Sequence, residues 1–269
     1  MARPDDSSEK LRRHFESTYL SLRIGVAAIG VALPFALWIG AQLLEGSSLQ
    51  SSMSAYYYTG MRDVFVGALF AIGVALYLYR GFSPVENVVL SVAGVLAVCV
   101  ALFPTQDGDE RAAVHVVHAV AAIGFFACLA YVSVFRAGDT LSLIRDTRRA
   151  HALKGLYRGL GVAMLLSPLV ALVAERVLRP PGGEPSVVFF VEVFGVWAFA
   201  VYWSVKSWEV WQTSADRAAS QGILAASPGL ERAGVPGRLV QTAPLDESVE
   251  ESRRDFEARD QEQATKVRS

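Results

Sequence analysis

Six continuous apolar runs constrain the fold of this chain more than any other feature of its sequence. They cover residues 24–44, 64–79, 88–103, 112–135, 159–174 and 187–205. A hydrocarbon core about 30 Å thick requires roughly 20 helical residues, and fewer where flanking side chains reach the interface. Because lipid offers no partner for the backbone, a continuous run inside it must form a helix. The runs therefore predict an all-α fold, an integral membrane bundle of six transmembrane helices.

Composition excludes several other classes of protein. Hydrophobic residues make up 52% of the chain, and the six runs leave almost no amphipathic surface for a water-soluble helical domain. The runs are continuous, whereas the strands of an outer-membrane barrel alternate. A formal net charge of −1 gives no footprint for nucleic acid, so no such partner is expected. The two cysteines, Cys99 and Cys128, lie inside apolar runs and have neither disulfide nor metal spacing.

Basic residues are distributed unevenly between the two sides of the predicted bundle. They gather before the first run, in the 136–158 connection and after the last run, whereas the other side has few. Because positively charged loops stay in the cytoplasm, both termini are predicted to be cytoplasmic. The chain then divides into a cytoplasmic segment at 1–21, the six-helix domain at 22–212 and a mostly disordered cytoplasmic tail at 213–269. Lys206 can snorkel inward from the end of the last helix.

Polar residues collect on the opposite, outer side of this predicted bundle. The set comprises Ser54, Tyr58, Arg62, Asp63, Arg111, His115, His118 and Glu192. The two histidines are three residues apart, so they share one face of their helix. Glu192 lies about 8 Å along the last helix, at a depth where an unpaired carboxylate is costly. The sequence therefore predicts a polar pocket on the extracytoplasmic side.

Three hypotheses account for this set. In the first, His115 and His118 bind zinc together with Asp63 or Glu192, and a water completes the shell. In the second, the pocket holds a lipid head group or a small ligand without metal. In the third, Glu192 is paired with a histidine or an arginine and the pair locks the helices together. A small-solute transporter is a further alternative, although no inverted repeat or pair of interrupted helices is visible. No cofactor other than zinc is considered.

Small residues recur four apart along the fifth apolar run and its lead-in. They are Gly155, Gly159, Ala163, Ser167 and Ala171. Such a stripe lets a neighbouring helix come close, which is how helices associate in lipid. It predicts either a seam between two copies of the chain in a homodimer or close packing within one copy. The other partner expected is the bilayer itself.

The segments at 54–67 and 101–105, with Glu192, Trp197 and Lys206 in the last run, resemble an uncharacterised family of bacterial multi-pass membrane proteins. That family is a domain of unknown function. The resemblance covers roughly residues 19–208. It implies a location in the bacterial inner membrane and implies no particular activity.

Ser54, Asp63, His115 and His118 are more distantly similar to positions of the membrane hydrolase superfamily of alkaline ceramidases, adiponectin receptors and hemolysin III-like proteins. Those proteins place a Ser, an Asp and three histidines around zinc within seven helices. The similarity implies a zinc-dependent hydrolase of lipid amide or ester bonds. This chain departs from the pattern, because Tyr58 stands where a histidine is wanted and no third histidine lies on the outer side. Whether the protein is an enzyme therefore stays open.

Overall fold

The computed structural model describes residues 6–104, 112–177 and 187–215, all of which belong to one unit, Met1–Leu224. These ranges are helical and contain no strand. The predicted tail beyond 215 and the predicted site residue Arg111 lie outside them. The elements follow in the order α1 (Asp6–Glu45), η1 (Ser54–Tyr58), α2 (Arg62–Leu78), α3 (Pro84–Leu102), α4 (Ala112–Tyr131), η3 (Val132–Arg136), η4 (Ala137–Leu143), α5 (Thr147–Val177) and α6 (Val187–Thr213).

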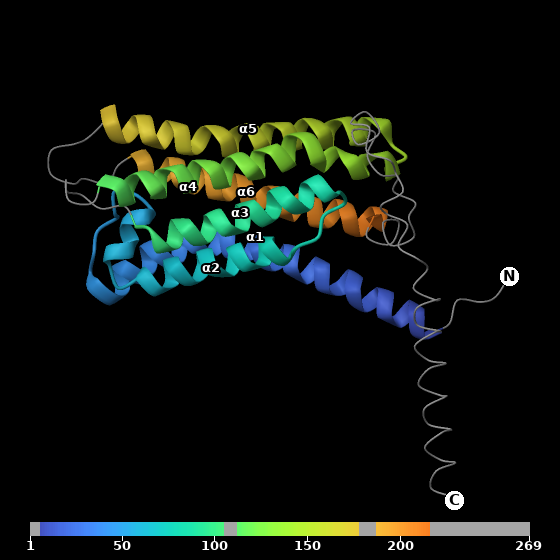
Figure 1. Ribbon diagram of the computed structural model, residues 1–269, viewed down its shortest axis with the longest axis horizontal. Helices are drawn as coiled ribbons and strands as arrows, with labels where there is room; N and C mark the ends of the chain where they lie inside the picture. The colour runs from blue at the N-terminus through green and yellow to red at the C-terminus, as the bar shows by residue number, and fades with distance from the viewer. Residues whose placement is uncertain (1–5, 105–111, 178–186, 216–269) are drawn as a thin grey trace, which may run out of the picture. The chain divides into compact units, whose positions relative to one another are not determined.

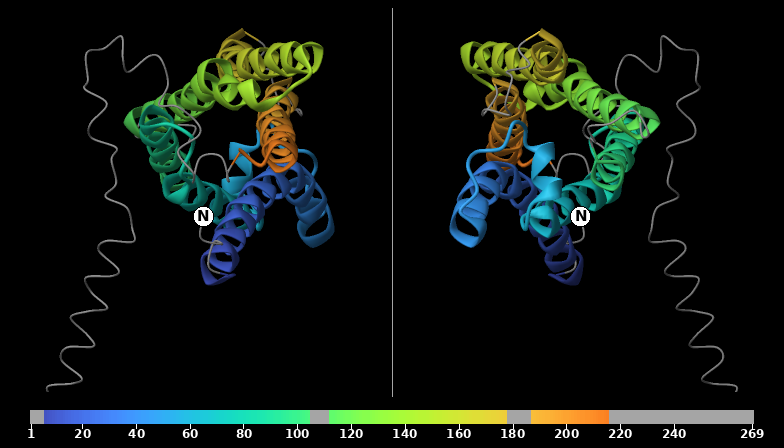
Figure 2. Two further views of the ribbon diagram at one scale, coloured as in Figure 1. Left: turned by 90° about the vertical axis from the view of Figure 1, so that its right-hand side faces the viewer. Right: turned by 90° about the vertical axis from the view of Figure 1, so that its left-hand side faces the viewer.

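Successive α-helices run in opposite directions along a common axis (Figure 1). Each packs against its neighbours in sequence, and α6 packs against α1, so the contacts close a ring, which the views along the axis show (Figure 2). We call one end of the bundle the η1 end; it holds residues 46–61 and the starts of α4 and α6. The opposite end, the η4 end, holds residues 79–83, η3, η4 and the end of α6. Short connections explain why sequence neighbours are also neighbours in space.

Five described helices are long and apolar enough to cross a membrane. They cover Glu16–Glu45, Pro84–Leu102, Val114–Leu143, Thr147–Ala174 and Val187–Thr213. The prediction of an all-α fold is confirmed, and these five helices indicate a membrane protein. The sixth predicted span corresponds to α2, which has 17 residues. At 1.5 Å per residue it is about 25 Å long, a little less than a typical hydrocarbon core, so six spans stay a prediction.

The distribution of apolar side chains fits a lipid surrounding. Leu90, Ala93 and Ala97 of α3 are completely buried inside the ring, and they pack in one cluster with Trp203 of α6. Large apolar side chains also cover the outside, where Val120 is 62% exposed and Phe194 is 59% exposed. An apolar exterior of this extent is unusual for a soluble protein and is what a bilayer solvates.

The helices α2 and α3 approach each other backbone to backbone. A Cβ added to Gly73 would lie 2.8 Å from the carbonyl oxygen of Gly94, and one added to Gly94 would lie 2.9 Å from the amide nitrogen of Tyr77. Only glycine fits both positions, because the neighbour in each case is main chain. This close approach fixes how α3 is rotated against α2, and it therefore positions the polar residues at the start of α3.

Candidate functional site

At the η1 end, two carboxylates hold the connection between α1 and α2. The backbone N–H of Met53 donates to Glu192 Oε2 at 2.5 Å, and the N–H of Gly60 donates to Glu45 Oε1. Tyr56 is completely buried in this connection and packs against Phe189 of α6. Burial raises the pKa of the Tyr56 hydroxyl, and the backbone N–H of Gln50, which donates to that hydroxyl, partly offsets the rise. Glu192 thus fastens a loop to α6.

The other predicted site residues of this end form separate contacts. Arg62 donates to the Tyr57 hydroxyl at 2.9 Å and lies 4.5 Å from the centre of that ring. Ser54 Oγ lies 3.0 Å from Ser52 Oγ. Tyr58 is 54% exposed, and its ring meets the ring of Tyr57 edge to face. These residues fasten η1 and the start of α2, and none of these contacts joins them to the histidines.

His118 is buried on α4, and its Nδ1 lies 2.7 Å from the carbonyl oxygen of Phe103. Because a carbonyl only accepts, Nδ1 is the donor in this hydrogen bond. His115 is half-buried and Asp63 is exposed at the first turn of α2. The described residues contain no group of three His, Cys, Asp or Glu side chains placed to hold a metal. The pocket of the η1 end and its zinc therefore stay predictions.

The η4 end contains a buried ion pair that the sequence did not reveal. Lys206 and Glu209 of α6 are 2% and 1% exposed, and the ammonium lies 3.1 Å from Glu209 Oε2. The spacing of three residues places both side chains on one face of the helix. The sequence predicts that Lys206 can snorkel inward from the end of α6, but its ammonium is buried against Ala137 and Thr140 of η4 and the Tyr157 ring of α5.

Hydrogen bonds saturate this pair. Lys206 donates to the carbonyl of Ala137 at 2.9 Å and to the hydroxyl of Thr140 at 2.6 Å. Glu209 in turn accepts from the hydroxyls of Thr140 and Tyr157. The acceptors in η4 become available because the chain leaves α4 through a π-helical turn, η3, and then a 3₁₀ turn, η4. Such interruptions of an α-helix free main-chain groups and recur at functional sites.

We call Lys206, Glu209, Thr140 and Tyr157 the Lys206 cluster. Further buried polar side chains surround it. Arg23 of α1 donates to the hydroxyl of Tyr79 at 3.0 Å, and the Tyr79 ring meets the Trp203 ring edge to face. Glu86 of α3 is 3% exposed, accepts the N–H of Phe82 at 2.9 Å and attracts Lys206 electrostatically. Five helices or turns thus contribute polar groups to one layer of the η4 end.

A polar pocket of about 280 Å³ opens beside the Lys206 cluster. Its lining combines residues of η3, η4 and α5: Ser133, Val134, Phe135, Gly138, Asp139, Lys154, Tyr157 and Arg158. Asp139 forms an ion pair with Arg136 at 2.8 Å. Lys154 and Arg158 are exposed, and neither forms an ion pair with another described residue. Within the described ranges both cations thus lack a paired acid, and the Tyr157 wall of the pocket is shared with the Lys206 cluster. We call it the η3–α5 pocket.

Comparisons with family profiles, with curated proteins and with solved structures find no match to this chain. The family resemblances therefore stay predictions.

The Lys206 cluster left one signal in the sequence. Lys206 and Glu209 are charged residues three apart inside a stretch that is otherwise apolar and aromatic. That spacing is typical of an intrahelical pair. The partners Thr140 and Tyr157 come from other elements, and nothing in their local sequence indicates that they meet α6.

Proposed function

We propose that this chain is a multi-pass protein of the bacterial inner membrane that binds an anionic group at the cytoplasmic end of its bundle. In this proposal α2 is the sixth span, both termini are cytoplasmic, and the η4 end faces the cytoplasm. The basic residues of the 136–158 connection and of the segments before α1 and after α6 support this orientation.

The single observation that carries the proposal is the pair of cations in the η3–α5 pocket. Lys154 and Arg158 are four residues apart, so they lie one turn above the other on α5. Arginine binds phosphate and carboxylate oxygens through two parallel N–H groups, and lysine binds them as a point charge. The one acid of the lining, Asp139, is neutralised by Arg136 and leaves the pocket positive. A phosphate or carboxylate group fits this arrangement.

The Lys206 cluster supports the proposal by fixing the wall of the pocket. The hydroxyl of Tyr157 donates to Glu209, and its backbone carbonyl accepts from Ser133 at 2.7 Å. Tyr157 is 1% exposed, so the turn of α5 that bears Lys154 and Arg158 is held from behind. A rigid wall places the two cations before a ligand arrives and reduces the ordering cost of binding.

The source of the anion is either a soluble phosphate compound or a lipid head group, and one experiment distinguishes them. Protein is reconstituted in nanodiscs of neutral phosphatidylcholine, and its thermal unfolding is followed while inorganic phosphate replaces chloride at constant ionic strength. A midpoint that rises with phosphate supports a soluble anion. A midpoint that rises only when phosphatidylglycerol replaces part of the phosphatidylcholine supports a lipid head group.

The variant that tests the site is Lys154→Ala/Arg158→Ala, with Arg145→Ala/Arg148→Ala as the matched control. Both doubles remove two positive charges from the same end, but Arg145 and Arg148 do not line the pocket. We expect a smaller rise in the first double than in the control. An equal rise in both doubles, or none in wild type with either anion, would overturn the proposal.

A further inference from the structure

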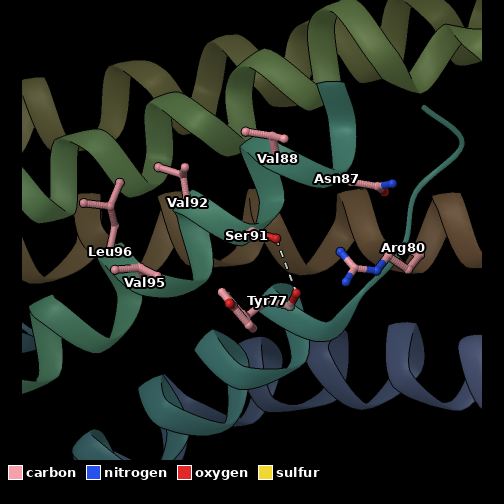
Figure 3. A pocket seen from close by; sticks show the side chains of 8 residues that line it. All are labelled: Tyr77, Arg80, Asn87, Val88, Ser91, Val92, Val95 and Leu96. Atoms are coloured by element: carbon pink, nitrogen blue, oxygen red, sulfur yellow. Dashed lines mark hydrogen bonds between the residues drawn. The ribbon is translucent and has the colours of Figure 1, made fainter. Parts of the chain in front are cut away.

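A second hollow at the η4 end lies between α2 and α3 and differs in character from the η3–α5 pocket. This groove has a volume of about 370 Å³ and is lined by Tyr77, Arg80, Asn87, Val88, Ser91, Val92, Val95 and Leu96. Figure 3 shows Arg80 and Asn87 together at one end and Val95 and Leu96 at the other. The groove therefore has a polar head and an apolar body.

The apolar body is one face of α3. Val88, Val92 and Val95 follow one another at intervals of four and three residues, and they are 63%, 46% and 52% exposed. Side chains at this spacing line up along a helix. The hydroxyl of Ser91 beside this face donates to the carbonyl of Tyr77 at 3.4 Å, so its hydrogen-bond donor is already used (Figure 3). The surface that remains is suited to a hydrocarbon chain.

The polar head has donors available to a ligand. Arg80 is exposed at the end of α2 and forms no ion pair with the residues that the structure describes. Asn87 Oδ1 accepts the N–H of Gly81 at 2.6 Å, which fixes the amide and leaves its NH₂ group as a donor. Arg80 and Asn87 are therefore complementary to an anion with several acceptor oxygens.

We propose that this groove binds one anionic phospholipid, with its phosphate on Arg80 and Asn87 and one acyl chain along Val88, Val92 and Val95. We infer this occupant because a cationic head lies directly beside an apolar body in the groove. A soluble anion would not use the apolar body, and a hydrocarbon without charge would not use Arg80. The proposal rests on the membrane location proposed above, but it does not require that the η3–α5 pocket binds an anion.

The head-group half is tested by lipid retention. Wild type, Arg80→Gln and the control Arg145→Gln are reconstituted in phosphatidylcholine containing a minor fraction of phosphatidylglycerol, and native mass spectrometry measures which lipids stay bound. One arginine near a membrane surface contributes about 1 kcal/mol to binding an anionic lipid, which is roughly a five-fold change. We expect Arg80→Gln to lower the preference for phosphatidylglycerol roughly five-fold, and Arg145→Gln to leave it unchanged.

The acyl-chain half is tested by filling the groove. Val92→Trp places a large ring over the apolar body, whereas Val162→Trp places it on α5 at a residue of similar exposure, 50% against 46%. We expect the retained phosphatidylglycerol to fall in Val92→Trp only. Retention unchanged in Val92→Trp and Arg80→Gln would overturn the proposal, as would an equal fall in both controls. Arg80→Gln should lower the preference by the same factor in wild type and in Lys154→Ala/Arg158→Ala, so failure of the pocket and failure of the groove give different results.

Discussion

At the scale of single residues, the Lys206–Glu209 pair is the most consequential feature of the chain. Both side chains are almost completely buried, and removing two charges from water costs several kcal/mol unless hydrogen bonds compensate. Here Thr140, Tyr157 and the carbonyl of Ala137 supply that compensation. Such a pair adds little net stability over apolar residues, but breaking it leaves a buried charge without its partner.

Lys206→Met should therefore destabilise the bundle by about 3–5 kcal/mol, because the Glu209 carboxylate then remains buried without a cation. Glu209→Gln should cost less, because the amide keeps one acceptor oxygen for either Thr140 or Tyr157, and Glu86 still attracts Lys206. The double variant Lys206→Met/Glu209→Gln should cost less than the sum of the singles. The measurement is the free energy of unfolding in detergent, with the exposed Lys154→Met as control. Additive effects would show that the two charges do not depend on each other.

Glu192 offers a second prediction at this scale. Its carboxylate accepts the N–H of Met53, so Glu192→Ala should cost about 1–3 kcal/mol by leaving that donor without its acceptor. Glu192→Gln keeps an acceptor oxygen and should recover most of the loss. Melting curves of the two variants, recorded side by side in detergent, check this. A Glu192→Ala variant that melts like wild type would remove the loop-fastening role.

His115 and His118 lead to a third prediction, which concerns zinc. The hypothesis of a metal-free pocket around His115 and His118 predicts that purified protein contains no stoichiometric zinc, whereas the zinc hypothesis predicts one zinc per chain. Elemental analysis after growth with added zinc measures this. One zinc per chain that disappears in His115→Ala/His118→Ala would instead favour the hydrolase hypothesis.

At the scale of elements, the contact of α2 with α3 depends on Gly73 and Gly94. Gly94→Ala should destabilise the bundle by about 1–3 kcal/mol, because the new methyl group meets main-chain atoms that cannot move aside. Gly67 of the same helix pair has nothing within 4 Å of its added Cβ. Gly67→Ala should therefore be neutral or stabilise by up to about 1 kcal/mol through helix propensity. Thermal unfolding of Gly94→Ala and Gly67→Ala measures both changes in stability. Equal changes in the two variants would contradict the close packing at Gly94.

The small residues of the α5 stripe differ in their surroundings: some pack closely against α6, and others have open space beside them. Ser167 faces Gly195 of α6, where an added Cβ would lie 2.8 Å from the Ser167 Cβ, and Ala171 is buried against Val188. Gly155 and Gly159 have nothing within 4 Å of an added Cβ. Ser167 and Ala171 thus pack within the chain. The homodimer stays a prediction, and within this stripe Gly155 and Gly159 are the positions left for a contact with a second copy.

The helices were predictable because a continuous apolar run of this length satisfies its backbone hydrogen bonds in lipid only as a helix. Their exact ends were not, and α1 begins at Asp6, well before the apolar residues that mark its span. The break after Tyr131 was also not predictable, because a change from α to π and then 3₁₀ hydrogen bonding leaves no periodic signature. The Lys206 cluster depends on that break, so its assembly could not be read from the sequence.

At the scale of the whole molecule, the ring of helices separates two polar layers. The η1 end carries the residues that the sequence singled out, and they fasten a loop through Glu192, Arg62 and Glu45. The η4 end carries a buried charge cluster and two hollows, one lined by Arg80 and the other by Lys154 and Arg158. The two proposed binding sites therefore lie at the end opposite to the one that sequence patterns favoured.

The orientation of these two ends in the membrane tests the account most directly. Ser48 and Ser142 are exposed residues of the η1 and η4 ends, and each is changed to cysteine in a chain whose Cys99 and Cys128 are replaced by serine. A membrane-impermeant maleimide is then added to intact spheroplasts. With the η4 end in the cytoplasm, we expect Ser48→Cys to be labelled at once and Ser142→Cys to be labelled only after permeabilisation. Immediate labelling of Ser142→Cys would contradict the proposed cytoplasmic end and, with it, the proposed site.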